Sequence, residues 1–150
     1  MVGILDISER KQMLVRSLSV LVAVASFACA NPTEPRAIPI QFDVITAQGA
    51  LDIVTVRPEP ASVTVSTNYV GVACNPLGAF ARRRGSTLQL IVTPQSKSAC
   101  AGPAVLYVYH AKLLGLDGGT YTLELYHGKQ NGSDLHLIES TSVEIPAGAI

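Results

Sequence analysis

The sequence predicts an all-β protein, an antiparallel β-sandwich of about seven or eight strands over residues 38–150, preceded by an N-terminal signal segment. Short runs of apolar residues alternate with polar ones, which is the period of a strand with one buried face. Gly, Pro, Asn and Asp separate these runs at short intervals. No convincing helical pattern follows residue 36. These three observations favour a sandwich, and a small closed barrel is the alternative.

The first three strands are expected at 38–44, 51–56 and 62–73. Pro39 lies inside the first of them, and proline cannot donate a ladder hydrogen bond, so it indicates an edge position. The prolines within 57–60 are expected to end the second strand for the same reason. The third strand is rich in β-branched residues, which favour extended structure.

The stretch 104–127 predicts a β-hairpin at the centre of the domain. Apolar side chains occupy both faces of an extended segment at 104–111, which is typical of an inner strand. Turn residues at 116–119 interrupt the pattern, and 120–126 resumes strict alternation. The other strands can be arranged around these two limbs.

Further strands are expected on both sides of this hairpin. A hairpin turn near residue 85 joins strands at 79–84 and 88–92. Asn131-Gly132 is a strong signal for a two-residue hairpin turn. The last strand or pair of strands follows it at 134–145.

Composition and charge set one class of partner aside. The chain has 150 residues and no Trp, so Val, Ile, Leu and Ala must build most of the core. The formal net charge is zero, and residues 31–150 carry eight Lys and Arg against nine Asp and Glu. Proteins that bind nucleic acid usually carry a basic excess that neutralises phosphates, so nucleic acid is not expected as a partner.

Residues 1–30 resemble an export signal. Three basic residues within 10–16 precede an uncharged apolar run at 17–30 that ends in small residues. This run is shorter than the roughly 20 residues that a membrane-spanning helix needs. An N-terminal helix that is never cleaved is the alternative, and Met13 is a second candidate start of translation.

Two processing routes fit the end of this run. Ala28 and Ala30 flank Cys29 in an A-x-A arrangement, which predicts cleavage after Ala30. Residues 26–29 also resemble a bacterial lipobox, in which the cysteine becomes the acylated first residue of a lipoprotein. Ala28 matches that motif, whereas the two residues before it depart from it. The polar, Pro-rich segment 31–37 is the spacer expected between a lipid anchor and a folded domain.

Removal or acylation of Cys29 leaves Cys74 and Cys100. An even pair of cysteines in an exported protein predicts a disulfide, which would pin the polar loop 93–103 to the end of the third strand. Closing a loop of about 27 residues would stabilise the fold by roughly 3–4 kcal/mol. Two free thiols, or half of a metal site, are the alternative.

A resemblance to a known family rests on residues 116–121. The sequence Leu-Asp-Gly-Gly-Thr-Tyr, followed by an alternating strand, resembles the L-x-x-G-x-Y turn of immunoglobulin-like and fibronectin-type domains in bacterial envelope proteins. The resemblance implies an immunoglobulin-like sandwich in which the Tyr121 hydroxyl anchors a corner by bonding to upstream backbone. With its leader and spacer, the chain resembles a small bacterial envelope lipoprotein or secreted protein.

His127 and His136 are the candidate metal pair. If Asn131-Gly132 is a two-residue turn, they lie directly opposite each other on neighbouring strands, close enough to share a metal ion. Two ligands alone do not make a tight site, so solvent-facing histidines at a strand end are the alternative. His110 lies on a mostly apolar strand without a catalytic motif, and it is expected to be a hydrogen-bonded structural histidine.

Arg82, Arg83 and Arg84 form the only run of charges in residues 31–150. Near a hairpin tip, they could contact anionic lipid headgroups, lipopolysaccharide phosphates or an acidic partner. In a strand, however, Arg82 and Arg84 point to one face and Arg83 points to the other. A solvated tip that keeps an exposed edge from pairing is the alternative.

No catalytic template fits the sequence, and we expect no cofactor. The leading hypothesis is a non-enzymatic, exported binding or structural module at the bacterial cell envelope, lipid-anchored through Cys29, periplasmic or secreted. One alternative is a secreted inhibitor or ligand-binding protein that uses disulfide-held loops. Another is a small metal-binding protein built on His127 and His136. The sequence does not identify the ligand or the envelope partner.

Overall fold

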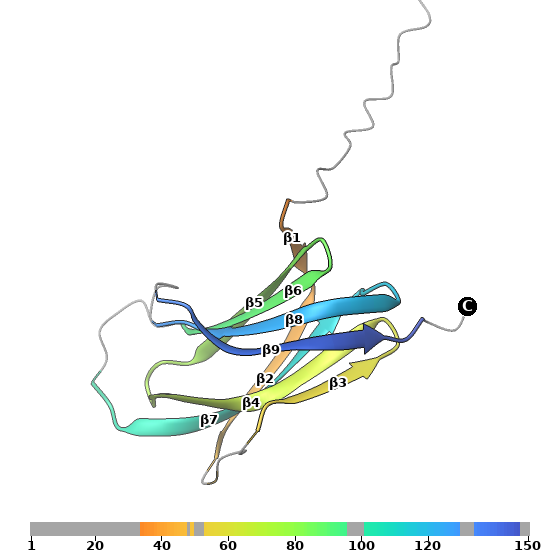
Figure 1. Ribbon diagram of the computed structural model, residues 1–150. Coiled ribbons are helices and arrows are strands. Elements are labelled where there is room, and N and C mark those ends of the chain that lie inside the picture. The colour runs from red at the N-terminus through yellow and green to blue at the C-terminus, as the bar shows by residue number, and fades with distance from the viewer. Residues whose placement is uncertain (1–33, 48, 50–52, 96–100, 130–133, 148–150) are drawn as a thin grey trace, which may run out of the picture. The chain divides into compact units, whose positions relative to one another are not determined.

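The computed structural model describes residues 34–47, 49, 53–95, 101–129 and 134–147. These residues form nine β-strands and no helix (Figure 1). The strands are β1 (Arg36–Ile38), β2 (Ile40–Ala47), β3 (Thr55–Glu59), β4 (Ser62–Val72), β5 (Leu77–Arg84), β6 (Thr87–Pro94), β7 (Ala104–Leu114), β8 (Gly119–His127) and β9 (His136–Ile145). The prediction of an all-β fold is confirmed for this part of the chain.

The nine strands form two sheets that face each other. Sheet A has five strands in the order β1-β5-β6-β8-β9, and sheet B has four in the order β2-β7-β4-β3. Figure 1 shows β5, β6, β8 and β9 in one layer and β7, β4 and β3 in the other. The arrangement resembles a β-sandwich, because one hydrophobic core includes residues from both sheets.

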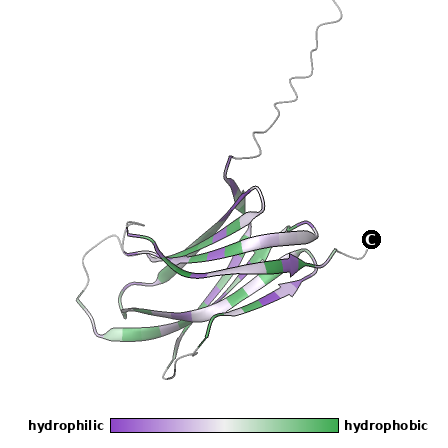
Figure 2. Ribbon diagram, viewed as in Figure 1, coloured by the Kyte–Doolittle hydropathy of each residue, from purple (hydrophilic) through white to green (hydrophobic). Residues whose placement is uncertain are grey.

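The inward side chains of both sheets form this core. Every second residue of a strand points inward, so Val63 of β4 and Leu88 of β6 are fully buried. Figure 2 shows apolar and polar stretches alternating along the strands. Because the chain has no Trp, Tyr107, Tyr109 and Tyr121 supply the largest side chains in the core.

The first predicted strand is divided between the two sheets. β1 pairs with β5 at the edge of sheet A, and β2 pairs with β7 at the edge of sheet B. Pro39 lies between them, where its missing N–H removes no ladder bond. Its carbonyl oxygen accepts a hydrogen bond from the Leu114 amide at 2.9 Å. The edge position predicted from Pro39 is confirmed, and this division raises the strand count above the predicted seven or eight.

The two limbs of the central stretch do not form the predicted hairpin. β7 is an inner strand, as predicted, but it lies in sheet B between β2 and β4, whereas β8 lies in sheet A. The connection is therefore an arch between sheets. Gly115 has a φ of 70°, in the left-handed region that glycine adopts without strain. Turn residues show correctly that the chain reverses here, but the two limbs bury their apolar faces by stacking across the core.

One pair of neighbouring strands is parallel, whereas the sequence predicts only antiparallel neighbours. β6 and β8 pair in parallel from Thr87 opposite Thr122 to Val92 opposite His127. Only β7 separates them along the chain, and it runs back through the other sheet. β6 and β8 therefore enter sheet A in the same direction. The remaining pairs of described strands are antiparallel.

The second strand departs from its predicted bounds. β3 begins at Thr55 and continues through Pro58, which lies opposite Val63, to Glu59. β3 is the edge of sheet B, and the outer side of an edge strand needs no ladder donor, so proline is tolerated there. β4, β5, β6 and β9 lie close to their predicted bounds.

Some predictions concern residues outside the described ranges. They include the signal segment 1–30, the turn Asn131-Gly132 and Cys100. Within the described ranges, no helix is long and apolar enough to cross a membrane.

Candidate functional site

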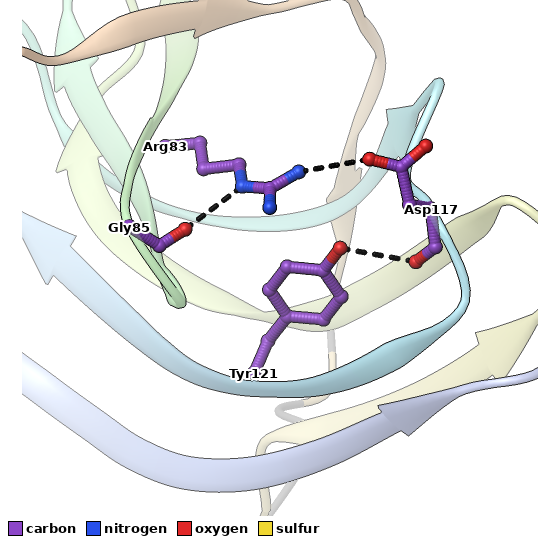
Figure 3. Close-up of polar contacts among 4 residues, drawn as sticks. All are labelled: Arg83, Gly85, Asp117 and Tyr121. Carbon is purple, nitrogen blue, oxygen red and sulfur yellow. Dashed lines mark hydrogen bonds and ion pairs between the residues drawn. The ribbon is translucent and has the colours of Figure 1, made fainter. Parts of the chain in front are cut away.

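Tyr121 lies where the arch from sheet B enters β8 (Figure 3). Its ring is buried, and its hydroxyl donates a hydrogen bond to the carbonyl oxygen of Asp117 at 3.0 Å. This bond runs back to upstream backbone, as the resemblance to immunoglobulin-like domains implies. It closes a ring across the arch and holds the connection between the two sheets in one shape.

Arg83 covers the same corner. Its Nε donates to the carbonyl oxygen of Gly85 at 2.8 Å, and its guanidinium forms an ion pair with Asp117 at 3.2 Å (Figure 3). The guanidinium carbon lies 5.0 Å from the centre of the Tyr121 ring, within the range of a cation–π contact. Arg83 therefore makes structural contacts, and the three consecutive arginines do not form one patch.

Arg82 and Arg84 lie on the opposite face of β5 from Arg83, as the alternation of a strand predicts. Arg82 Nε donates to Gln89 Oε1 at 2.7 Å, and Gln89 Nε2 donates to Glu124 Oε2 at 2.8 Å. Arg84 is exposed beside the hairpin turn. The outer face of β5 thus presents one hydrogen-bonded arginine and one solvent-facing arginine.

His127 lies directly opposite His136 in the β8–β9 ladder, as predicted. His136 is exposed, whereas His127 Nε2 lies 2.7 Å from the Tyr109 hydroxyl oxygen. Among the described residues, no group of three or more His, Cys, Asp or Glu could hold a metal ion. This position therefore offers a metal only two imidazoles, and one of them is already hydrogen-bonded.

The His127 imidazole packs among aromatic rings. Its centre lies 5.0 Å from that of Tyr69 and 5.8 Å from that of Tyr109. Burial lowers the pKa of His127 to about 4, so the imidazole is neutral at pH 7. Burial also raises the pKa of the Tyr109 hydroxyl, which stays protonated. The two neutral groups share one hydrogen bond at the end of the core.

Cys74 lies in the turn after β4, and Cys100 lies outside the described residues. The Ala73 amide donates to the carbonyl oxygen of Pro103 at 3.1 Å. A Cβ atom added to Gly102 would lie 3.2 Å from Cys74 Sγ. Cys74 Sγ is therefore close to a residue that follows Cys100 by two positions in the sequence. This proximity supports the disulfide, which stays a prediction.

The sequence did not predict a hollow on the outer face of sheet B, which we call the sheet B hollow. It has a volume of about 300 Å³ and lies over β3, β4 and β7. All of its lining residues are polar: Thr55, Arg57, Glu59, Thr64, Ser66 and His110. Three hydroxyl side chains, one imidazole, one guanidinium and one carboxylate therefore share this surface.

One row of the ladder crosses the sheet B hollow. Its members are direct neighbours across four strands: Asp43, His110, Ser66 and Thr55. Ser66 Oγ and His110 Nδ1 lie 2.7 Å apart, so His110 is hydrogen-bonded as predicted. Ser66 lies on β4, an inner strand that is hydrogen-bonded to β7 on one side and to β3 on the other.

The charges around the hollow differ in their partners. Lys112 Nζ forms an ion pair with Glu59 Oε2 at 2.6 Å, and this hydrogen-bonded pair lowers the pKa of the Glu59 carboxyl group. Arg57 is exposed and makes no hydrogen bond or ion pair with another described residue. Its charge also lowers the pKa of the nearby Glu59 carboxyl group, but its hydrogen-bond donors are not used by another described residue.

The polar residues of the hollow left only a weak signal in the sequence. Thr55, Arg57 and Glu59 alternate along one strand, as Thr64 and Ser66 do along the next, but solvent-facing sides of strands commonly show this pattern. Comparisons of the chain with protein-family models, with curated proteins and with solved structures find no match. The function is therefore inferred from the residues and their geometry.

We expect Tyr121→Phe to lower the free energy of unfolding by about 1 kcal/mol, because it removes one hydrogen bond and keeps the ring. Tyr126→Phe is the matched control on the same strand. Its hydroxyl donates to the Glu124 carboxylate at 2.9 Å near the surface, where water can replace the lost bond. Urea denaturation at pH 7 measures both losses. Equal losses would contradict a specific role for the corner bond.

The free energy of unfolding should fall as the pH drops from 7 to 4.5. The ordinary pKa of histidine is 6.5, whereas folding lowers that of His127 to about 4, so protons bind the unfolded chain preferentially between these values. With allowance for partial solvent exposure, this change is about 1–2 kcal/mol. His127→Gln should flatten the dependence on pH, whereas His136→Gln should not. Urea denaturation across this pH range measures the free energy of unfolding of each protein. If it depended on pH in His127→Gln as it does in the unchanged protein, His127 would not be the residue responsible.

The intact mass of the protein isolated from its native source tests the disulfide and the leader together. Reduction should raise the mass by two hydrogen atoms if Cys74 and Cys100 are joined. An acylated Cys29, a new N-terminus at Asn31 and an uncleaved leader give three different masses.

Cys74→Ser should lower the free energy of unfolding by roughly 3–4 kcal/mol in the oxidised protein. An unchanged mass on reduction would argue against the disulfide.

Proposed function

We propose that the protein is a non-enzymatic binding module, exported to the bacterial cell envelope, that holds an anionic polar ligand in the sheet B hollow. The exposed Arg57 guanidinium, which has no hydrogen-bond or ion-pair partner among the described residues, carries this proposal. A carboxylate or phosphate offers several acceptor oxygens, and guanidinium binds such groups with two parallel hydrogen bonds. The ligand class is therefore an anion of one of these two kinds.

The arrangement of the hollow supports binding to an extended polar group. Its donors occupy two neighbouring rows of the ladder, with Arg57 opposite Thr64 in one and Thr55 opposite Ser66 in the other. Side chains directly opposite each other in a sheet are about 5 Å apart, so several of them can contact one ligand. Because the donors lie on paired strands, their backbone positions are fixed before the ligand arrives, which reduces the entropy cost of binding.

The N-terminal sequence supports export. A basic segment, an apolar run and a Pro-rich spacer precede the described strands in the order typical of exported bacterial proteins. The close approach of Cys74 to Gly102 favours a disulfide, and disulfides persist in oxidising compartments. We propose lipid anchoring through Cys29 as the route to the envelope.

We also propose that the domain is a variant of the immunoglobulin-like type. The Tyr121 corner bond and the two facing sheets support this relationship. The parallel β6–β8 pair differs from the fully antiparallel sheets of the standard type. The variant therefore shares the corner and the layers but differs in strand order.

Titration of the full-length chain with inorganic phosphate and with glucuronate tests ligand binding. In NMR spectra, we expect the chemical shifts of backbone amides in β3, β4 and β7 to change around Arg57, Ser66 and His110. Arg57→Gln should weaken affinity for the better of the two probes on the order of tenfold, because it removes a charge-assisted hydrogen bond. Arg84→Gln, an exposed arginine on sheet A, is the matched control and should change little. Shifts confined to other surfaces would argue against the hollow as the ligand site.

A further inference from the structure

A row of apolar side chains crosses the outer face of sheet A, and we call it the sheet A row. Its four members are direct neighbours in the ladder: Phe80 of β5, Ile91 of β6, Tyr126 of β8 and Leu137 of β9. Their neighbours along β5, β6 and β8 point into the core, so the row points outward. Ile91 is only 2% exposed, whereas Phe80 is 49% and Leu137 53% exposed. The two ends of the row are therefore open to solvent.

Two arginines share this outward face. Phe80, Arg82 and Arg84 alternate along β5 toward the hairpin turn. Arg84 is exposed and makes no hydrogen bond or ion pair with another described residue. Glu124, the carboxylate in the same ladder row as Arg82, already accepts two side-chain hydrogen bonds. An apolar row thus lies next to the positively charged end of β5, whereas the carboxylates of this face, Glu124 and the exposed Glu144, lie on β8 and β9.

The chain enters the domain beside this strand end. β1 pairs with β5 so that Arg36 lies opposite Arg83. Six residues lie between Cys29 and Arg36 in the sequence, and the seven steps from one Cα atom to the next span at most about 25 Å. A lipid on Cys29 would therefore keep this edge of sheet A within a short distance of the membrane.

We propose that the outer face of sheet A rests on an anionic lipid surface. Phe80 and Leu137 enter the boundary between headgroups and acyl chains, and Arg84 contacts the lipid phosphates. A lipid surface offers an apolar layer beneath a layer of phosphates, which matches the two chemistries of this face. The inference rests on the proposed export and on the lipid anchor at Cys29.

This contact would also orient the sheet B hollow. The two sheets face each other, so their outer faces point in opposite directions. Docking of sheet A on lipid therefore turns the sheet B hollow away from the membrane, toward the solvent from which a soluble anion arrives. An acyl anchor without this contact would tether the domain but leave its orientation free.

A single introduced tryptophan tests the contact, because the chain has none of its own. Phe80→Trp reports on the outer face of sheet A. Ile45→Trp is the matched control on the outer face of sheet B, where Ile45 is 59% exposed. Both full-length proteins carry the same leader, so attachment through the leader is equal in the two. The probe is a vesicle of phosphatidylglycerol and phosphatidylcholine with brominated acyl chains, which quench tryptophan on contact.

We expect the tryptophan of the Phe80→Trp protein to be quenched several-fold more strongly than that of the Ile45→Trp protein. Adding Arg84→Glu to Phe80→Trp should reduce the fraction of domains in contact with lipid on the order of tenfold, because it replaces attraction to phosphate with repulsion. Arg57→Glu, on the other outer face, should have little effect. Circular dichroism establishes that each variant is folded. Equal quenching in the two single-tryptophan proteins would overturn the proposal.

Three further results separate this inference from the proposed function. Absence of quenching in a protein whose native form carries an acylated Cys29 would overturn the docking and leave the anchor in place. A native mass without acylation would overturn the anchor, and the docking proposal with it. If light scattering showed dimers that Phe80→Trp disrupts, the sheet A row would belong to a second copy of the chain, which also overturns the proposal. Binding of phosphate or glucuronate in the sheet B hollow is measured independently of all three.

Discussion

The stacking of two sheets through a core that contains tyrosine is the constraint on which the rest of the structure depends. Without Trp, tyrosine rings are the largest side chains in the core, and each buried hydroxyl must find a hydrogen-bond partner. The partners are the carbonyl oxygens of Val72, Asp117 and Gly128 and the ring of His127. All of them lie at strand ends or in connections. The hydroxyls therefore tie the ends of the sandwich to its core, and no buried side-chain nitrogen or oxygen of the described residues lacks a partner.

This constraint also explains the unexpected topology. β7 and β8 each have one strongly apolar face, and an arch lets these faces meet across the core. A hairpin would have placed them in the same layer, with both faces turned to one side. The bond from Tyr121 to Asp117 stabilises the arch where it enters β8, and the parallel β6–β8 pair follows from the arch. The departures from a fully antiparallel sandwich thus have one physical cause.

The sequence was sufficient for features that depend on local pattern. The strand bounds of β4 to β6 and the edge position of Pro39 follow from alternation and turn chemistry over a few residues. The corner bond of Tyr121 was implied by the resemblance of residues 116–121 to immunoglobulin-like domains. The pairing of β7 and β8 with distant strands could not be predicted in this way. Turn residues show where the chain reverses, but they do not show which sheet the next strand joins. The sheet B hollow could not be predicted from the sequence for the same reason. Ser66 and His110 meet only through the β4–β7 register, which joins residues that are 44 positions apart.

The two outer faces of the domain differ in a way that the shared core makes possible. In each strand, alternate residues are buried between the two sheets. The remaining residues do not pack against the facing sheet, so their side-chain types can suit the surroundings of the outer face. Sheet B presents hydroxyls, an imidazole and an exposed guanidinium together with the exposed side chains of Ile45 and Val70, whereas sheet A presents a continuous apolar row across four strands. A face that contacts only water would not be expected to carry a phenylalanine opposite an isoleucine. Exposing apolar side chains to water costs free energy, whereas exposing polar side chains does not. The proposed lipid contact of sheet A and the proposed ligand of sheet B would therefore lie on opposite sides of the two packed sheets.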